Sequence, residues 1–192
     1  MVREYALDAL AEPDATLVID ETGFLKQGKA SYGVGGQYTG SARKITNCQI
    51  DVFAASPSSK GHAFIDRRLY LPKDWTGNPD RLVKAQVPED VRFAIKPAIA
   101  VAIVRRAIDA GVLFASVAAG SIYGVSELEM ALRRAGKGYL LGVTGSHRFT
   151  SWSPTLSVSG TAEEIARELP AESWIRLSAG DGTKGSRLYD RG

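Results

Sequence analysis

The stretch that most constrains this chain is Ala15–Phe24, because it joins an apolar run to two adjacent carboxylates. Residues 16–19 are β-branched or apolar, which predicts a strand buried on both faces. The strand is expected to end at Asp20 and Glu21, ahead of Gly23. A carboxylate at the end of a buried strand is held rigidly, as a metal site or a general base requires. From these residues alone, the alternative is that both carboxylates only cap the following turn.

The composition restricts the metals that such carboxylates could bind. The 192 residues include one cysteine, Cys48, and two histidines, which excludes an internal disulfide and a cysteine-based zinc cluster. A metal would therefore be held by oxygen atoms, which suits Mg²⁺ or Mn²⁺. The net charge of +3 permits a nucleic-acid partner without requiring one. The longest apolar run, residues 98–104, is far shorter than the roughly 20 residues of a membrane helix.

The first half of the chain predicts an antiparallel meander. A short helix is expected over 3–12, ahead of the first strand. Residues 44–55 alternate apolar and polar side chains, which is typical of an antiparallel strand with one solvated face. Residues 62–71 predict a further strand, and the even spacing of apolar residues over 32–38 is also strand-like. A polar loop is expected over 73–92.

The second half alternates helices with short strands. The predicted elements are a helix over 96–110, a strand over 112–119, a helix over 127–135 and a strand over 139–143. This order implies parallel pairing. Beyond residue 145 serine, threonine, glycine and proline are frequent, and only a helix over 163–169, with Thr161 as its N-cap, and a strand over 174–177 are predicted. The chain therefore divides into residues 1–144 and a partly irregular part, 145–192.

Several motifs accompany this layout. They are Val18–Lys26, Gly36–Gly40, Asn47–Gln49, Phe64–Pro72, Lys96–Pro97, Ile122–Gly124, Gly138–Val143 and Trp174–Asp190. With them, nearly the whole chain resembles the DDE transposases of bacterial insertion sequences, in the branch with a DDE-superfamily endonuclease domain. The resemblance implies an α/β fold with a ribonuclease-H-like core, an antiparallel β-meander followed by β-α-β units. It also implies that residues 145–192 begin a β-rich insertion.

The resemblance further implies DNA cleavage and strand transfer during transposition and recombination. In such enzymes three carboxylates hold two divalent ions, Mg²⁺ or Mn²⁺, about 3.5–4 Å apart. By its motif, Asp20 is the first catalytic, metal-binding acid, and Glu21 lies on the opposite face of the strand, where it tunes or caps. The implied partners are transposon-end and target DNA and a second transposase copy, without a membrane. The implied location is the bacterial cytoplasm, in association with the nucleoid.

The sequence departs from the family pattern at the second acid. The Tyr123–Gly124 pair that follows this acid in relatives is present, but the acid's own position holds Gly120, which cannot bind a metal. The third acid is expected beyond an insertion in which this chain stops, so the chain is interpreted as truncated at both ends. These features predict a catalytically inactive fragment of a DDE transposase. The alternatives are a non-catalytic DNA-binding or regulatory remnant, and a relic without a selected function.

Basic residues outside the carboxylate site are candidates for contacts with DNA phosphates. The candidates are Lys26, Lys29, Arg43, Lys44, Lys184 and Arg187. The first four belong to the meander side and the last two to the glycine-rich tail. A solvated basic face is the alternative for the first four. Trp75 is expected to anchor the core or a loop rather than to stack on bases.

Overall fold

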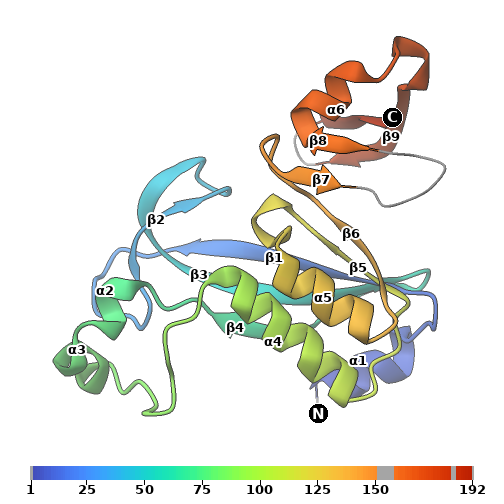
Figure 1. Cartoon of the computed structure of the whole chain (residues 1–192). Helices are drawn as coiled ribbons and strands as arrows, with labels where there is room; N and C mark the ends of the chain where they lie inside the picture. The colour runs from blue at the N-terminus through green and yellow to red at the C-terminus, as the bar shows by residue number, and fades with distance from the viewer. Residues whose placement is uncertain (1, 151–157, 183–184, 192) are drawn as a thin grey trace. The chain divides into compact units, whose positions relative to one another are not determined.

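A computed structural model describes residues 2–150, 158–182 and 185–191 (Figure 1). It contains two compact units, Met1–Gly142 and Val143–Gly192, and each is described by itself. The elements of the first unit are α1 (Val2–Leu10), β1 (Thr16–Leu25), β2 (Gly35–Thr39), β3 (Lys44–Ser58), β4 (Gly61–Leu69), α2 (Lys73–Thr76), α3 (Pro79–Lys84), α4 (Lys96–Asp109), β5 (Ser116–Ala119), η1 (Ser121–Tyr123), α5 (Ser126–Arg134) and β6 (Gly138–Leu141). No helix among the described residues is long and apolar enough to cross a bilayer.

The first unit is organised around a six-stranded mixed sheet. Its strand order is β2-β3-β1-β5-β6, and β4 pairs with β3 along the same edge as β2. The strands β1, β3 and β4 pair antiparallel, whereas β5 and β6 run parallel to β1. This is the predicted meander followed by β-α-β units. The structure therefore confirms the α/β class and the ribonuclease-H-like core.

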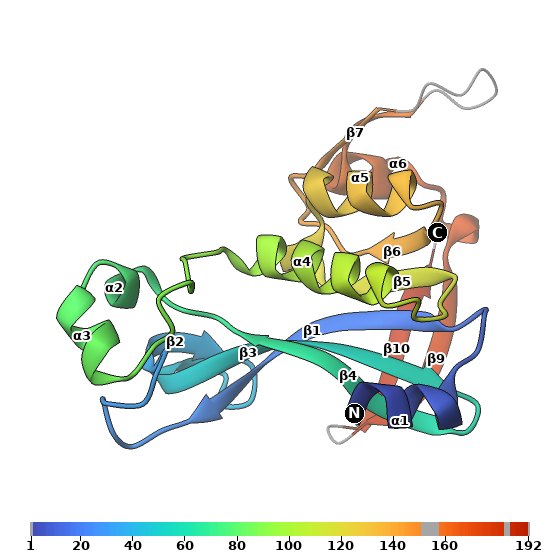
Figure 2. The same ribbon diagram turned by 90° about the horizontal axis from the view of Figure 1, so that it is seen from below.

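Three helices cover one face of this sheet, which we call the covered face (Figure 2). On β1 it includes Leu17 and Ile19, each 1% exposed, and on β3 it includes Val52 and Ala54. They share one apolar core with side chains of α1, α4 and α5. Each buried aliphatic side chain of this kind contributes about 2 kcal/mol to stability. The helix predicted at 96–110 is confirmed as α4, and its dense apolar positions are buried.

The opposite face, the open face, carries the alternate residues of the same strands. Val18 on β1 is only half-buried, while Phe64 on β4 and Leu140 on β6 are 61% and 77% exposed. No helix of residues 2–142 packs on this face. The prediction that the first strand is buried on both faces is therefore wrong. Apolar content alone did not reveal that the helices cover a single side.

Two element boundaries also differ from the sequence prediction. The strand β1 does not end at Asp20 but continues to Leu25, because β3 pairs with it along its whole second half. The expected loop over 73–92 contains the short helices α2 and α3. Asn78 caps α3 by accepting a hydrogen bond from the amide of Arg81 at 3.0 Å, and Pro79 follows at the first helical position. Trp75 of α2 is buried in a small second core, as expected of an anchor.

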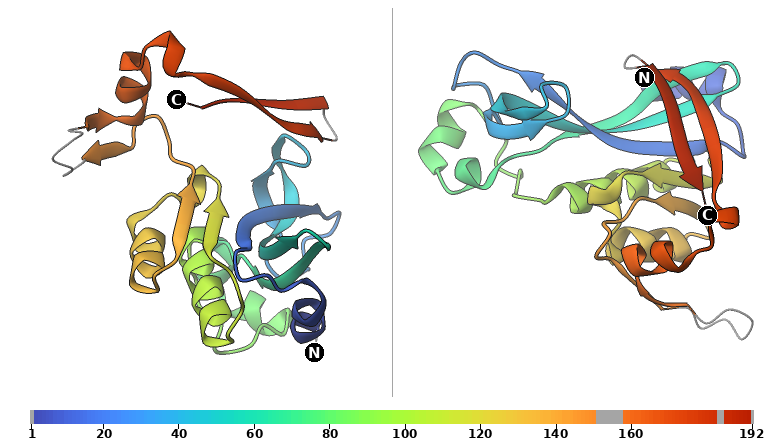
Figure 3. Two further views of the ribbon diagram at one scale, coloured as in Figure 1. Left: turned by 90° about the vertical axis from the view of Figure 1, so that its right-hand side faces the viewer. Right: turned by 90° about the horizontal axis from the view of Figure 1, so that it is seen from above.

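The second unit contains β7 (Arg148–Thr150), β8 (Ser159–Thr161), α6 (Ala162–Glu168), η2 (Ala171–Ser173), β9 (Ile175–Gly182) and β10 (Gly185–Arg191). Thr161 caps α6 in a reciprocal capping box with Glu164, as the sequence predicts for its N-cap. The strand expected over 174–177 is confirmed as the start of β9, and β9 and β10 form the antiparallel hairpin drawn in red in Figure 3. The ion pair between Arg176 and Asp190, at 2.7 Å, joins the two strands.

Candidate active site

Asp20 lies where β1 passes the end of its parallel neighbour β5. The last pair in the register of these strands is Ile19 with Ala119. The next residues along the two strands are Asp20 and Gly120, so they lie side by side at the carboxyl end of β5. Gly120, the position at which the family resemblance implies a second acid, therefore lies next to Asp20.

The backbone at Gly120 would accept a larger residue. Its φ of −70° and ψ of 176° are extended values that any residue adopts. A Cβ atom at this position would meet no other atom within 4 Å. Neither backbone strain nor crowding therefore forbids a carboxylate at this position.

The turn after β5 is held close to β6. The amide of Gly142 donates to the carbonyl of Ala119 at 2.8 Å, and the amide of Tyr123 donates to the carbonyl of Gly120 at 2.9 Å. A Cβ atom on Gly142 would lie 2.9 Å from the amide nitrogen of Ser121, so only glycine fits there without a shift. The backbone position beside Asp20 is fixed by these contacts.

Glu21 points to the covered face and is bound from two sides. One carboxylate oxygen accepts a hydrogen bond from the Lys96 ammonium at 3.1 Å, and the other accepts from the Tyr123 hydroxyl at 2.5 Å. Tyr123 is fully buried, and burial together with the carboxylate of Glu21 raises the pKa of its hydroxyl. The hydroxyl therefore stays protonated and donates to Glu21. This triad joins β1, α4 and the turn after β5, and sequence analysis gave Lys96 and Tyr123 no such role.

Asp20 points to the open face and is exposed to solvent. One of its carboxylate oxygens accepts a hydrogen bond from the amide of Glu21 at 2.9 Å. Partial burial against the sheet raises the pKa of Asp20, and the charge of Glu21 adds to this effect; the Glu21 amide and Lys96 oppose it. The carboxylate is accessible to a ligand, but its surroundings favour the protonated form.

Asp51 is an acidic residue on the same open face, and sequence analysis did not single it out. It lies opposite Thr22 in the β1–β3 register, one row along from Asp20. Its side chain is buried, with Oδ2 at 3.5 Å from Nη1 of Arg67 and Oδ1 without a hydrogen-bond partner among the described residues. Burial raises the pKa of Asp51, while Arg67 and Lys26 lower it. An acid inside an alternating strand pattern is the signal that could have identified it.

The residues present do not fit a pair of divalent ions. Within the described part of the chain, no three histidine, cysteine, aspartate or glutamate side chains gather as metal ligands. Beside Asp20 the chain offers Gly120, and the carboxylate of Glu21 is already bound by Lys96 and Tyr123. A two-metal site needs several carboxylates in common reach of both ions. A single exposed carboxylate does not meet this requirement.

The predicted DNA contacts fall into two groups. Lys26, Arg43 and Lys44 are exposed at one end of the sheet, where β1 ends and β3 begins. Lys26 is six residues beyond Asp20, or about 20 Å along the strand. Arg187 is exposed in β10 of the second unit, at an irregularity in the hairpin register. Lys184 lies outside the described residues.

Three amide side chains hold the loop between β1 and β2 against the sheet. Asn47 donates to the carbonyls of Lys26 and Gly28, at 2.7 and 2.9 Å. Gln37 donates to the carbonyl of Gly33 at 3.3 Å, and Gln49 donates to the carbonyl of Tyr32. These bonds satisfy loop carbonyls that no strand partner reaches. We call this arrangement the amide clamp. It gives a structural reason for the glutamine and asparagine residues of the motifs Gly36–Gly40 and Asn47–Gln49.

Comparisons with known proteins give a solved structure and a family model that are similar to this chain. The chain is similar to a solved piggyBac transposase in a synaptic complex with hairpin DNA. The two share 13% sequence identity with a TM-score of 0.45, and the match covers 93% of this chain and 33% of that one. The chain thus spans about a third of the length of that transposase. A search of curated protein sequences gives no significant match. The model of the DDE superfamily endonuclease family matches residues 1–178, so the chain belongs to this family.

Proposed function

We propose that this chain is part of a DDE transposase catalytic domain that binds DNA but does not cleave it by itself. Enzymes of the DDE superfamily cut DNA with divalent metal ions held by carboxylates. The observation that carries the proposal is the β1–β5 register, in which the neighbour of Asp20 is Gly120. A lone carboxylate binds Mg²⁺ weakly, because Mg²⁺ demands a near-octahedral set of oxygen ligands.

The loss of cleavage can be tested directly. The full chain is incubated with supercoiled plasmid and Mn²⁺, and nicked product is quantified beside the Asp20→Ala variant. We expect equal, background-level nicking from both proteins, since Asp20 alone does not assemble a two-metal site. Nicking by the unmodified chain well above that of Asp20→Ala would contradict the proposal.

A second experiment restores a carboxylate beside Asp20. Calorimetric titration with Mn²⁺ compares the unmodified chain with Gly120→Asp, and Gly120→Asn serves as a control of equal shape without charge. Because the position is open, Asp at 120 is expected to fit and to tighten Mn²⁺ binding by about tenfold or more, equivalent to about 1.4 kcal/mol. Equal Mn²⁺ affinity of the Asp and Asn variants would show that position 120 does not face the metal site.

DNA binding is tested by electrophoretic mobility shift at several salt concentrations. We expect affinity to fall steeply with salt, since basic side chains that contact phosphates release counterions. Replacing Lys26, Arg43 and Lys44 together by glutamine should reduce the salt slope by about one for each lost contact. Lys60→Gln is the control, because Lys60 is exposed in the turn at the far end of β3. If the chain did not bind DNA even at low salt, the DNA-binding proposal would be wrong. The remaining interpretation would be a relic without a selected function.

A further inference from the structure

A small pocket lies at the end of the sheet away from Asp20. It is lined by the edge strand β2, the loop held by the amide clamp, and residues of α2 and α3. Its volume is ≈ 210 Å³, below the range of about 300–1,000 Å³ for sites that enclose drug-sized ligands. Gly35 and Gly36 present bare backbone to it. The pocket therefore cannot admit a DNA duplex or enclose a drug-sized ligand, and it suits a ligand of which only part enters it.

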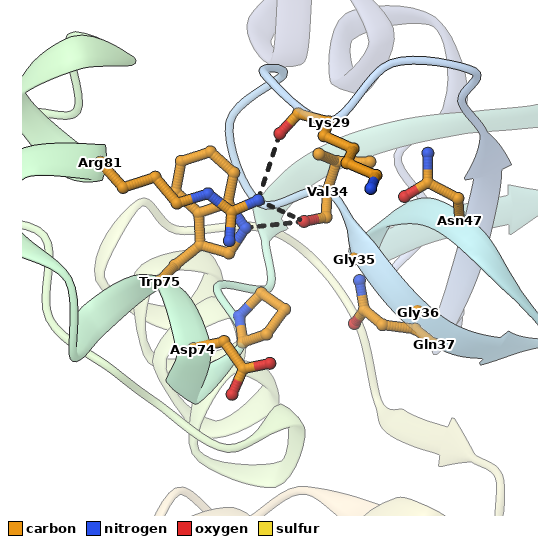
Figure 4. A pocket seen from close by; sticks show the side chains of 10 residues that line it. Lys29, Val34, Gly35, Gly36, Gln37, Asn47, Asp74, Trp75 and Arg81 are labelled. Carbon is orange, nitrogen blue, oxygen red and sulfur yellow. Dashed lines mark hydrogen bonds between the residues drawn. The ribbon is translucent and has the colours of Figure 1, made fainter.

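One wall of the pocket is a guanidinium held in a fixed position. The Arg81 guanidinium lies flat over the Trp75 indole, 3.8 Å from the ring centroid. It donates to the carbonyls of Lys29 and Val34 at 3.2 and 3.4 Å, and the indole N–H donates to the same Val34 carbonyl at 2.7 Å (Figure 4). Arginine has five N–H donors, so this guanidinium retains donors for a ligand.

The second cation of the pocket is Lys29, which projects from the clamped loop. Among the described residues, neither Lys29 nor Arg81 is paired with a carboxylate. Asp74 also lines the pocket, so the charges of Lys29, Arg81 and Asp74 sum to one positive charge. Two unpaired cations beside a small opening favour an anionic group of about the size of a phosphate.

The wall opposite Trp75 supplies hydrogen-bond acceptors. Gln37 and Asn47 lie across the pocket from Trp75 and Arg81 in Figure 4. Their amide nitrogens donate to backbone carbonyls of the loop, so their amide oxygens remain as acceptors. A phosphate group mainly accepts hydrogen bonds, so it gains nothing from these amide oxygens. The exocyclic amine of a nucleobase, in contrast, donates hydrogen bonds to them. The two walls together match a ligand that carries both a phosphate and a donor group.

We propose that this pocket binds a single unpaired nucleotide of DNA, whose phosphate contacts Lys29 and Arg81 while its base donates to Gln37 and Asn47. The proposal deepens the proposed DNA binding, on which its DNA assignment rests. It adds a contact to single-stranded DNA about 20 Å along the sheet from Asp20. Of the basic residues named from the sequence as DNA contacts, Lys29 lines this pocket, and Arg81 is added by the structure.

The first test separates the pocket from DNA binding in general. The full chain with ¹⁵N-labelled tryptophan is titrated with deoxyadenosine monophosphate, with deoxyadenosine and with inorganic phosphate, and indole N–H signals are followed by NMR. The Trp75 signal is assigned by replacing the two other tryptophans with phenylalanine. We expect the nucleotide to shift this signal at lower concentration than either of its halves does. No shift with the nucleotide, or an equal response to phosphate alone, would overturn the proposal.

Charge-removing variants complete this test. Lys29→Gln should weaken nucleotide affinity about tenfold, as expected for loss of one hydrogen bond to a charged group. Lys60→Gln, which removes an exposed lysine outside the pocket, should leave it unchanged. Equal affinities of Lys29→Gln and the unmodified chain would contradict the assignment of the phosphate.

The second test identifies the source of the nucleotide. Mobility shifts compare a blunt duplex with the same duplex carrying a three-nucleotide single-stranded end. The overhang should tighten binding several-fold, and Lys29→Gln should abolish this gain, so that the variant binds the blunt and the overhanging duplex equally. If the free nucleotide binds but the overhang gives no gain, the DNA assignment is wrong. If neither duplex binds while the nucleotide does, the proposed function fails and the pocket stands as a site for free nucleotides.

Discussion

Asp20 and Glu21 are neighbours on β1, yet the two faces of the sheet give their carboxylates opposite surroundings. Glu21, on the covered face, is bound by Lys96 and Tyr123 and joins three elements. Asp20, on the open face, is exposed and accepts one amide hydrogen bond from the adjacent residue. Strand alternation thus separates an architectural carboxylate from one that is free to meet a ligand. The comparison predicts that substitutions on the covered face change stability far more than those on the open face.

The largest expected contrast uses the same substitution on both faces. Leu17→Ala on the covered face should lower the free energy of unfolding by about 2–5 kcal/mol, because it leaves a cavity in the shared core. Leu140→Ala on the open face should lower it by less than about 0.5 kcal/mol, since this side chain is 77% exposed. Urea unfolding followed by circular dichroism measures both. Similar losses would mean that the open face is buried in solution.

The Glu21 triad should give the next largest effect. Glu21→Ala leaves the buried hydroxyl of Tyr123 without an acceptor and removes the ion pair of Lys96, so we expect a loss of about 2–3 kcal/mol. Glu21→Gln should lose less, because an amide oxygen still accepts from Tyr123. Glu89→Ala, which removes an exposed carboxylate from a loop, is the control and should change stability little. If Glu21→Ala were as stable as this control, Glu21 would have no architectural role.

On the open face, removing the charge of Asp51 should stabilise the protein rather than destabilise it. Asp51→Asn is expected to raise the free energy of unfolding at pH 7 by about 1 kcal/mol, since it removes a buried charge with an unpaired oxygen. The pKa of Asp51 is raised in the folded protein, so its ionisation opposes folding above that pKa. The gain should therefore shrink as the pH falls and vanish below the ordinary value of 3.8. Unfolding free energies at several pH values would check this, and a pH-independent gain would contradict it.

The smallest expected effect concerns Asp20 itself. Asp20→Asn should raise the free energy of unfolding by less than about 0.5 kcal/mol, because partial burial and the charge of Glu21 disfavour the ionised form, while solvent screens most of the effect. Thermal unfolding of the two proteins in one buffer without divalent ions compares them. A clear loss of stability on substitution would show that Asp20 has an architectural partner.

The sequence predicted the parts of this fold that depend on local pattern. The helix 96–110, the alternating strand 44–55 and the N-cap at Thr161 follow from spacing and capping chemistry. It did not show which face of β1 is open, because that depends on where α1, α4 and α5 pack. The strand expected over 174–177 is the start of β9, but the rest of β9 and the strand β10 were missed, since their glycine and charged residues have low strand propensity.

The sequence identified two positions of the candidate site, but not the contacts that surround them. Motif comparison singled out Asp20 and Gly120, and the register places them side by side. The partners of Glu21 come from residues 75 and 102 positions away in the chain, so spacing alone cannot pair them. The stacking of Arg81 on Trp75 depends on the short helices α2 and α3, which the sequence analysis read as a loop.

The open space around Gly120 has a consequence for the history of this gene. Every glycine codon becomes an aspartate or a glutamate codon when its second base changes to A. Since the backbone there is already extended and no atom blocks a side chain, no compensating substitution is needed to accommodate the new residue. A carboxylate beside Asp20 is thus a single base change away from this sequence.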